Sequence, residues 1–362
     1  MSHETDQTRE RRKIMEAGSR DFRNLGLKIF LPVAIGLGVV AWLFHREFDP
    51  AVWHSIRWDA WSLFGVALAW LAMAGRDFGM TWRFRALTSR QLSWGQALRV
   101  CMLCEFTSCI TPSSVGGSAV SMLFLNREGV ELGRATTLVM TTLLLDELFF
   151  VLALPVIICF VPYAEIFGFD KSAFSTGLQG AFWGIYGLIV IWTAALFFGV
   201  LAKPAVLNSM LTRLFSFRWL RRWRESAMET GRNMEATGRE LRNRGAGWWI
   251  ENFGATVFSW VSRFLVVNAL FLAFVPAASQ VVVLARQFVV WVILMVTPTP
   301  GGAGVSEWLF TTYYGDLIGS AGIALVIALM WRIVTYYVYL VIGAFIVPQW
   351  VRRSFGKGHK GA

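Results

Sequence analysis

Long apolar segments, separated by shorter polar ones, make up most of this chain. Several of them approach or exceed the roughly 20 residues that an α-helix needs to cross a bilayer. We therefore expect an all-α polytopic membrane protein with about six transmembrane helices. The predicted spans cover about residues 29–44, 58–75, 135–161, 180–201, 248–275 and 319–347.

Proline and glycine interrupt two further apolar segments, at about residues 96–126 and 281–314. Neither arm of the first segment is long enough to span alone, so we predict re-entrant helical hairpins. Irregular backbone at membrane depth is tolerated only where it is buried in protein or lines a cavity. Such a pair of broken segments, one in each half of a chain, is typical of a transporter binding site. The residues of the two breaks that we assign to this site are Pro112, Gly116, Gly117, Pro300, Gly301, Gly302 and Gly304.

The composition supports a membrane protein, because 56% of the 362 residues are hydrophobic and only 16% are charged. The net charge of +11 comes from basic residues in the polar segments beside the spans. We attribute this charge to membrane topology and to contact with anionic lipid headgroups at the cytoplasmic face. No recognised nucleic-acid-binding module accompanies the charge, so we expect no nucleic-acid partner.

Lysine and arginine set the expected orientation, because basic loops stay in the cytoplasm. The basic segments are residues 1–28, a loop after the second span, residues 203–247 and a tail at 348–362. Both ends of the transmembrane domain, residues 29–347, are then cytoplasmic, as expected for a multi-pass protein of the cell membrane. The basic residues assigned to the loop after the second span are Arg76, Arg83, Arg85 and Arg90.

The two hairpins then enter the membrane from opposite sides, which makes residues 58–161 and 248–347 an inverted-topology repeat. Measured from Gly117 and Gly302, charged residues recur at nearly the same offsets in the two repeats. The matched pairs are Arg99 with Arg286, Asp77 with Arg263, and Asp146 with Arg332. So many matches are hard to attribute to chance.

Charged side chains inside spans are costly and are functional candidates by default. Asp146 and Glu147 interrupt one apolar run, and Arg332 lies in the middle of the last span. Because Asp146 and Arg332 occupy equivalent positions with opposite charge, we hypothesise that they face each other near the membrane midplane. The alternative is a purely structural ion pair that holds the helices together.

Each glycine break should free backbone N–H groups at the start of a half-helix, which favours an anion such as phosphate or carboxylate. Arg99 and Arg286 can add a planar fork for a lipid phosphate. Glu307 follows the second break by one helical turn, and it can pair with an arginine, bind a cationic headgroup or take a proton. Alternatively, its carboxylate caps the freed N–H groups. We group these residues with Arg263 as a substrate-binding site, and we expect no catalytic residue and no metal ligand.

Cys101 and Cys104 have a spacing found in metal and redox sites, but no histidine or second cysteine pair accompanies them. We expect buried thiols that act as small hydrophobic groups. The chain carries no nucleotide-binding motif such as a Walker A sequence. We therefore expect no cofactor, and any energy for transport would come from gradients or from downhill scrambling.

Residues 203–247 form the one long polar segment of the chain. Glu235 with Arg239, and Glu240 with Arg244, make i,i+4 helix pairs in the favourable order. The segment is then either a basic helix on the cytoplasmic membrane surface or a solvated linker helix that sets the topology.

The run PGGxGxxE from Pro300 to Glu307 resembles the signature of the lysylphosphatidylglycerol synthase transmembrane family, which is also described as flippase-like. Other features resemble the family too: the first break, the span with two adjacent acidic residues, and the Trp331-Arg332 pair. The resemblance covers about residues 27–347. It implies a lipid translocator that moves a phospholipid or another lipid-linked headgroup between leaflets. In the best-known multidomain members, an aminoacylated phosphatidylglycerol is moved, and a separate soluble transferase domain attaches the amino acid.

This chain has no room for such a transferase domain, so we expect a transporter and not an enzyme. The first break lacks a glutamate equivalent to Glu307, which argues against a symmetric mechanism with two carboxylates. Two alternatives remain open. One is an integral-membrane lipid phosphatase or transferase that uses Ser306 with Glu307, or Ser113 with Ser114. The other is a small-solute or ion secondary transporter.

Overall fold

The structure, a computed structural model, describes residues 58–111, 114–167, 173–203, 224–299 and 301–355, and isolated positions between 203 and 224. Within these ranges every regular element is a helix. The first predicted span, the segment 1–28, Pro112, Pro300 and residues 356–362 lie outside the described residues.

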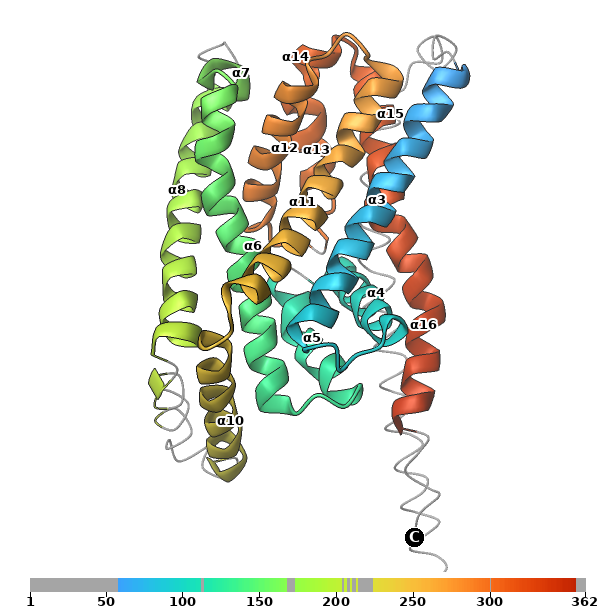
Figure 1. Ribbon diagram of the computed structural model, residues 1–362. Helices are drawn as coiled ribbons and strands as arrows, with labels where there is room; N and C mark the ends of the chain where they lie inside the picture. The colour runs from blue at the N-terminus through green and yellow to red at the C-terminus, as the bar shows by residue number, and fades with distance from the viewer. Residues whose placement is uncertain are drawn as a thin grey trace, which may run out of the picture.

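Helices of very different length follow one another along the chain (Figure 1). In chain order they are α3 (Ala60–Leu87), α4 (Trp94–Ile110), α5 (Ser114–Arg127), α6 (Leu132–Phe160), α7 (Tyr163–Phe167), α8 (Ala173–Leu196), the π-helix η1 (Phe197–Ala202), α10 (Arg224–Arg242), α11 (Ala246–Phe274), α12 (Gln280–Leu294), α13 (Val305–Tyr313), α14 (Gly315–Ile318), α15 (Ala321–Arg332), the π-helix η3 (Ile333–Tyr337) and α16 (Val338–Phe355).

Five helical segments in the described part of the chain are long and apolar enough to cross a membrane. They are Ala60–Leu87, Leu132–Phe160, Thr176–Ala202, Ala246–Phe274 and Ala321–Trp350. These segments correspond to the second to sixth predicted spans, which are thereby confirmed as apolar helices.

α3 continues past residue 75 to its end at Leu87, so the predicted basic loop that carries Arg76, Arg83 and Arg85 is wrong. Arg76 and Arg83 are only 3% and 2% exposed, because carboxylates on other helices pair with them. A buried charge that is paired and hydrogen-bonded does not have to reach water. The helix can therefore continue through these arginines, and the chain turns only near Arg90, where φ is 63°.

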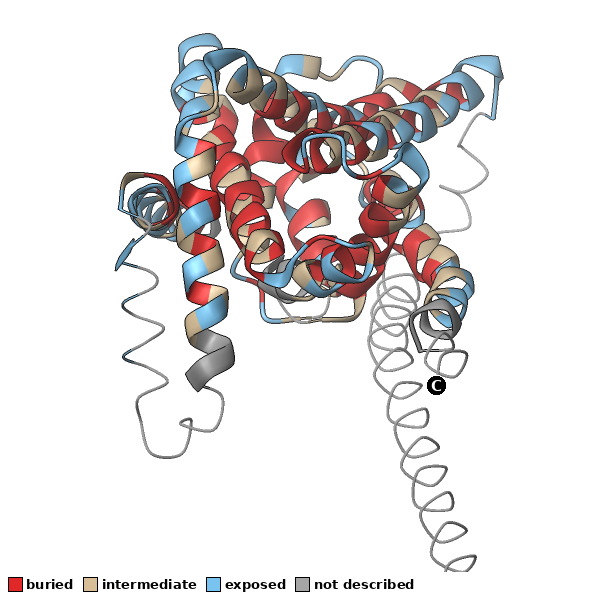
Figure 2. Cartoon of the chain, turned by 60° about the horizontal axis from the view of Figure 1, so that its bottom comes forward, coloured by how far each residue is buried: buried red, intermediate tan, exposed pale blue. Residues whose placement is uncertain are grey.

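α3 and α11 run side by side and pack against each other along their length. A Cβ atom on Gly65 would lie 2.6 Å from Cβ of Ala273, and one on Gly79 would lie 3.0 Å from the backbone nitrogen of Ser259. Small residues let the backbones of membrane helices approach this closely. Figure 2 shows the consequence for the whole molecule, with buried residues on the inward faces and exposed residues around them.

Two shorter helix pairs lie toward opposite ends of the bundle, α4 with α5 in the lower half of Figure 1 and α12 with α13 in the upper half. The first turn of α5 includes Gly116 and Gly117, so the interruption comes before these glycines. The second break is different, because Gly301, Gly302 and Gly304 all have positive φ and form the turn that leads into α13.

α10 packs against α6 at one end of the bundle, where Arg134 of α6 donates to Glu240 at 2.9 Å. The two predicted i,i+4 pairs are confirmed, since Arg239 contacts Glu235 and Arg244 contacts Glu240, each at 2.5 Å. Burial acts to raise the pKa of Glu240, but the hydrogen bond from Arg244 and the charge of Arg134 outweigh it and lower this pKa. The contact therefore stabilises the docked helix at neutral pH and is lost as the pH falls through the lowered pKa.

Candidate functional site

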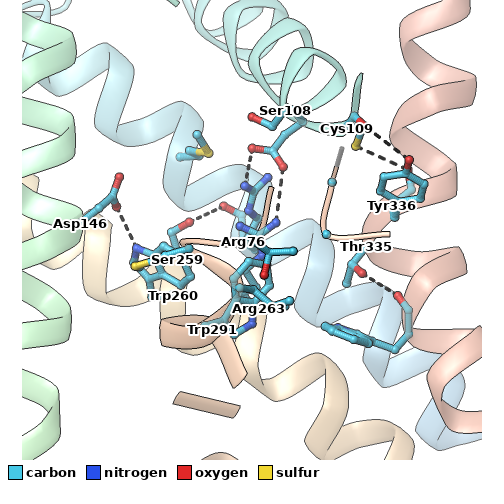
Figure 3. A pocket seen from close by; sticks show the side chains of 18 of the residues that line it. Arg76, Ser108, Cys109, Asp146, Ser259, Trp260, Arg263, Trp291, Thr335 and Tyr336 are labelled. Carbon is cyan, nitrogen blue, oxygen red and sulfur yellow. Dashed lines mark hydrogen bonds and ion pairs between the residues drawn. The ribbon is translucent and has the colours of Figure 1, made fainter. Parts of the chain in front are cut away.

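A cavity of about 220 Å³ lies inside the bundle, between α3, α4, α6, α11, α12, α15, η3 and the second break, and charged side chains line part of its wall (Figure 3). The described part of its wall carries four arginines and three carboxylates, which are Arg76, Arg83, Arg263, Arg332, Glu105, Asp146 and Glu147. Its aromatic residues are Trp260, Trp291, Trp331 and Tyr336. A concave site with convergent polar groups is the usual form of a ligand site, and charges inside a membrane bundle strengthen that interpretation.

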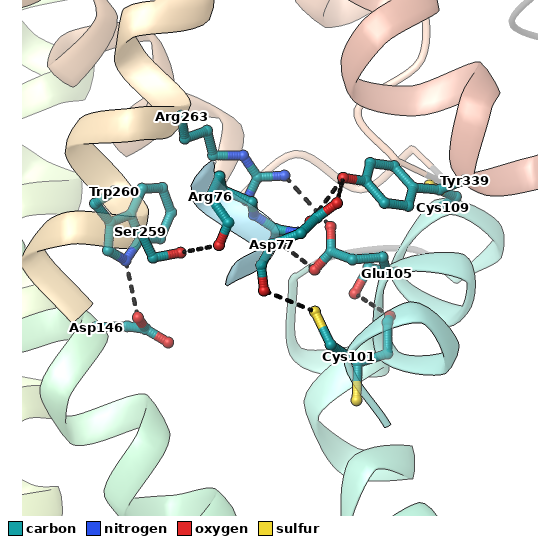
Figure 4. Close-up of polar contacts among 12 residues, drawn as sticks. Arg76, Asp77, Cys101, Glu105, Cys109, Asp146, Ser259, Trp260, Arg263 and Tyr339 are labelled. Carbon is teal, nitrogen blue, oxygen red and sulfur yellow. Dashed lines mark hydrogen bonds and ion pairs between the residues drawn. The ribbon is translucent and has the colours of Figure 1, made fainter. Parts of the chain in front are cut away.

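A cluster of paired charges joins four helices on one side of the cavity (Figure 4). Glu105 of α4 accepts a hydrogen bond from Arg76 of α3, and its second oxygen lies 3.6 Å from Nη2 of Arg263 on α11. Arg76 also pairs with Asp77 at 2.9 Å, and the hydroxyl of Tyr339 on α16 donates to the Asp77 carboxylate at 2.7 Å. Because each of these charges has a partner, their attraction offsets the cost of taking them out of water.

Asp146 of α6 pairs with Arg83 of α3 through two contacts, at 2.5 and 3.1 Å. The indole N–H of Trp260 on α11 donates to the same carboxylate at 2.8 Å. The hypothesised contact between Asp146 and Arg332 is therefore wrong, although both side chains line the cavity. Both positions lie at the cavity, but the packing of the helices decides which charges meet.

Arg332 of α15 is held on three sides. Its Nε lies 2.7 Å from Oε1 of Glu307, its Nη1 donates to the Gly301 carbonyl at 3.1 Å, and its guanidinium lies 3.9 Å from the ring centre of Tyr336. The second oxygen of Glu307 accepts from the backbone N–H of Gly304 at 2.7 Å, which caps α13. Glu307 thus combines two of the roles considered for it, because it both pairs with an arginine and caps the freed N–H groups.

The second break passes directly against the ring of Tyr336. A Cβ atom on Gly301 would lie 2.2 Å from Cε2 of that ring and 3.2 Å from the Cys109 carbonyl at the end of α4. Gly301 also has a φ of 56°, which side chains other than glycine adopt with strain. Only glycine therefore lets the second break lie between the first helix pair and η3.

Arg99 and Arg286, expected to hold a lipid phosphate, do not line this cavity. Arg99 pairs with Glu128, 29 residues later, at 2.5 Å. Arg286 pairs bidentately with Asp316, 30 residues later, at 2.5 and 2.7 Å. Each arginine thus joins the first helix of a pair to the segment that follows the second helix of that pair. Their role in the structure is to close the helix pairs.

Glu147 differs from the neighbouring Asp146 in its contacts. Both line the cavity, but Oε2 of Glu147 is buried and has no hydrogen-bond partner in the part of the chain that the structure describes. Glu105 and Asp146, the other carboxylates of the cavity wall, are paired with arginines. Glu147 is therefore available to a ligand without breaking an ion pair.

This difference predicts unequal effects of two neutralising substitutions. Asp146→Asn leaves buried Arg83 without its counter-charge, and we expect it to lower the free energy of unfolding by about 2 kcal/mol. Glu147→Gln breaks no ion pair, so its effect should stay within about 0.5 kcal/mol. Denaturant unfolding of the detergent-solubilised protein measures both values. Equal losses in the two variants would contradict this assignment of partners.

The pattern along the chain did not single out several residues of this site, above all Glu105, Arg76 and Arg83. Glu105 follows Cys104 in an apolar stretch, so the rule that draws attention to charges inside spans applies to it as well. Cys101 and Cys104 themselves are buried free thiols, as predicted. Arg76 and Arg83 resemble loop arginines in sequence, and only their buried partners reveal them as part of the site.

Comparison with known proteins agrees with these features. The family described as "Lysylphosphatidylglycerol synthase TM region" matches residues 29–343. A protein of Archaeoglobus fulgidus described as "UPF0104 membrane protein" is 26% identical over 321 residues, which cover 87% of this chain and 94% of the relative. No solved structure shows a significant match. The matched range includes both helix pairs and every described residue that lines the cavity, and the chain therefore belongs to the lysylphosphatidylglycerol synthase transmembrane family.

Proposed function

We propose that this protein is a lipid translocator. A phospholipid or another lipid-linked headgroup enters the cavity from one leaflet and leaves it to the other, while the acyl chains stay in the bilayer. The observation that carries this proposal is the charged cavity of about 220 Å³ inside a bundle of membrane-length helices. A polar group needs such an interior to pass the hydrocarbon region, where an unpaired charge is costly.

The arrangement of the helices supports alternating access as the mechanism. In our proposal six spans and two re-entrant hairpins form an inverted repeat. The protein lies in the cell membrane, and both of its termini are cytoplasmic. Two ion pairs favour this repeat, because each occupies the corresponding position in one of the two helix pairs. They are Arg99–Glu128 and Arg286–Asp316. Rocking of one repeat against the other would open the cavity to each side in turn.

The proposal does not include covalent chemistry. Ser306 and Glu307, one of the two residue pairs considered for a lipid phosphatase or transferase, are 0% and 1% exposed and are not among the residues that line the cavity. Ser113 of the other pair lies outside the described residues. Oε2 of Glu307 already accepts from Ser306 at 2.8 Å and from Gly304 at 2.7 Å. A nucleophile must reach its substrate within hydrogen-bond distance, so these positions favour transport over chemistry.

The test is leaflet exchange in liposomes that carry fluorescent phospholipids with different headgroups, with headgroup release followed in the same samples. We expect exchange without release for the wild-type protein. Ser108→Phe places a ring in the cavity and should reduce exchange to the rate of protein-free liposomes. Leu98→Phe is the matched control, because Leu98 lies on the same helix and is exposed.

Two results would contradict the proposal. If free headgroups are released as fast as the fluorescent lipid is lost from its original leaflet, the enzyme alternative is favoured. Exchange that is equally fast in Ser108→Phe, Leu98→Phe and the wild type would exclude the cavity as the route of the headgroup. If no lipid is exchanged, uptake of small solutes into the same liposomes becomes the next measurement.

A further inference from the structure

Two buried donor atoms on α15 have no hydrogen-bond partner among the residues that the structure describes. Arg332 is 5% exposed and Trp331 is 1% exposed, and both line the cavity. Nη2 of Arg332 and Nε1 of Trp331 form no hydrogen bond with any residue that the structure describes. A buried donor without an acceptor is expensive, more so when it is charged. Two such donors on adjacent residues therefore point to a ligand that supplies the acceptors.

The guanidinium of Arg332 is positioned before any ligand arrives. Glu307 holds its Nε, the Gly301 carbonyl accepts from its Nη1, and the ring of Tyr336 covers one of its faces. Among the described residues, Nη2 of Arg332 has no hydrogen-bond partner. A group fixed in this way loses little conformational freedom when a ligand binds, which favours affinity. The ion pair with Glu307 therefore orients the arginine and leaves one donor for the ligand.

Arg263 adds a second guanidinium to the same cavity. Its planar group lies 4.3 Å from the ring centre of Trp291 and 5.6 Å from that of Trp260. Its contact with Glu105 is long, at 3.6 Å, and Glu105 is shared with Arg76. Among the described residues, Nε of Arg263 has no hydrogen-bond partner. Arg263 is thus stacked in place and keeps capacity to donate.

Most of the cavity atoms that lack a hydrogen-bond partner among the described residues are donors and not acceptors. Within the described ranges the donors without acceptors are Arg83 Nε, Arg263 Nε, Arg332 Nη2, Trp291 Nε1 and Trp331 Nε1. Glu147 Oε2 is an acceptor without a donor, and the hydroxyl of Thr299 can act as either. Arginine and indole N–H groups can only donate. The ligand that satisfies them has to bring several acceptor oxygens and negative charge. Phosphate has both properties, and arginine binds it with matching geometry.

We propose that Arg332, Trp331 and Arg263 form a phosphate-binding subsite inside the cavity. The subsite rests on the proposed function and makes it more specific, because it selects lipids whose headgroup carries a phosphate. Its residues take the phosphate-binding role that the sequence suggested for Arg99 and Arg286, which the structure places in ion pairs away from the cavity. The phosphate can belong to a lipid phosphodiester or to a free anion, and the experiment separates the two sources.

The experiment is isothermal titration calorimetry of the full chain, purified in a maltoside detergent that contains no phosphate. The probes are inorganic phosphate, a water-soluble glycerophosphodiester, and sodium chloride at the same ionic strength. We expect both phosphates to bind and chloride not to compete. Tighter binding of the glycerophosphodiester assigns the subsite to a lipid headgroup, whereas binding of inorganic phosphate alone would overturn the assignment to a lipid.

Trp331→Phe keeps a ring beside Phe310 and removes the indole donor. We expect it to weaken phosphate binding about tenfold, as the loss of one hydrogen bond to a charged group does. Arg332→Lys keeps the positive charge next to Glu307 but loses the second donor of the fork, and should weaken binding at least as much. Trp192→Phe is the matched control, because Trp192 on α8 is exposed and lies outside the cavity wall, and this variant should bind as the wild type does.

Unfolding curves of all variants identify any that fail to fold, and Arg332→Lys provides an independent test if Trp331→Phe is unstable. Unchanged phosphate affinity in both folded variants would overturn the subsite. The outcome is separable from that of the transport assay. Phosphate binding without leaflet exchange would contradict translocation and retain the subsite, whereas leaflet exchange by a protein that binds no phosphate would overturn the subsite alone.

Discussion

Replacement of Glu105 by glutamine is expected to lower the free energy of unfolding by about 3 kcal/mol or more and to abolish transport. Glu105 is 6% exposed and carries the charge that faces both Arg76 and Arg263. Glutamine keeps the shape but leaves two guanidinium groups with only Asp77 to balance them. An uncompensated charge in the interior costs more than the loss of the contact itself. Denaturant unfolding in detergent measures the effect.

Two further variants make this prediction specific. Arg239→Gln breaks an ion pair of α10 in which the arginine side chain is 63% exposed, and should cost no more than about 0.5 kcal/mol. The double variant Glu105→Gln with Arg263→Gln leaves the Arg76–Asp77 pair intact and should recover part of the lost stability. If the double variant is less stable than Glu105→Gln by the full cost of a second independent substitution, the proposed coupling is absent.

The second large effect is expected at Glu307. Its ion pair with Arg332 is shielded on both sides, with side chains 2% and 6% exposed. Glu307→Gln should therefore cost about 3 kcal/mol by leaving the arginine uncompensated. Glutamine can still accept from the Gly304 N–H, whereas Glu307→Ala also removes the cap of α13 and should cost about 1 kcal/mol more. Unfolding curves of the two variants, measured side by side, give both values.

The order of these losses tests the two roles of Glu307 separately. Equal stability of Glu307→Gln and Glu307→Ala would mean that the cap contributes nothing. A wild-type-like Glu307→Gln would mean that Arg332 does not depend on this carboxylate. The double variant Glu307→Gln with Arg332→Gln should be more stable than Glu307→Gln, because it removes the unpaired charge together with its partner.

Much of the fold follows from local pattern. The apolar runs are long enough for membrane helices, so the helices from the second predicted span to the sixth agree with the structure. The Glu235–Arg239 and Glu240–Arg244 pairs also agree, because both partners lie on one helical face only four residues apart. Properties set by neighbours along the chain can be predicted without knowing the packing.

The end of α3 shows where local pattern fails. Arg76 and Arg83 read as a basic loop, because unpaired arginine does not stay at membrane depth. Their partners, Glu105 and Asp146, lie 29 and 63 residues away. Residues this far apart in the sequence come into contact only when the helices pack, and the hydrophobic periodicity of the chain does not indicate which of them will meet.

The candidate site divides in the same way. The sequence alone predicted a glycine break just before Glu307, and it placed Asp146 and Arg332 as charged residues inside two apolar spans. Both predictions rest on residue type and spacing, which the chain carries in itself. Tertiary structure decided that Asp146 meets Arg83, that Arg332 meets Glu307, and that a cavity remains between them. A charge in a membrane bundle pairs with whichever opposite charge the packing brings within reach, and that choice depends on all the helices at once.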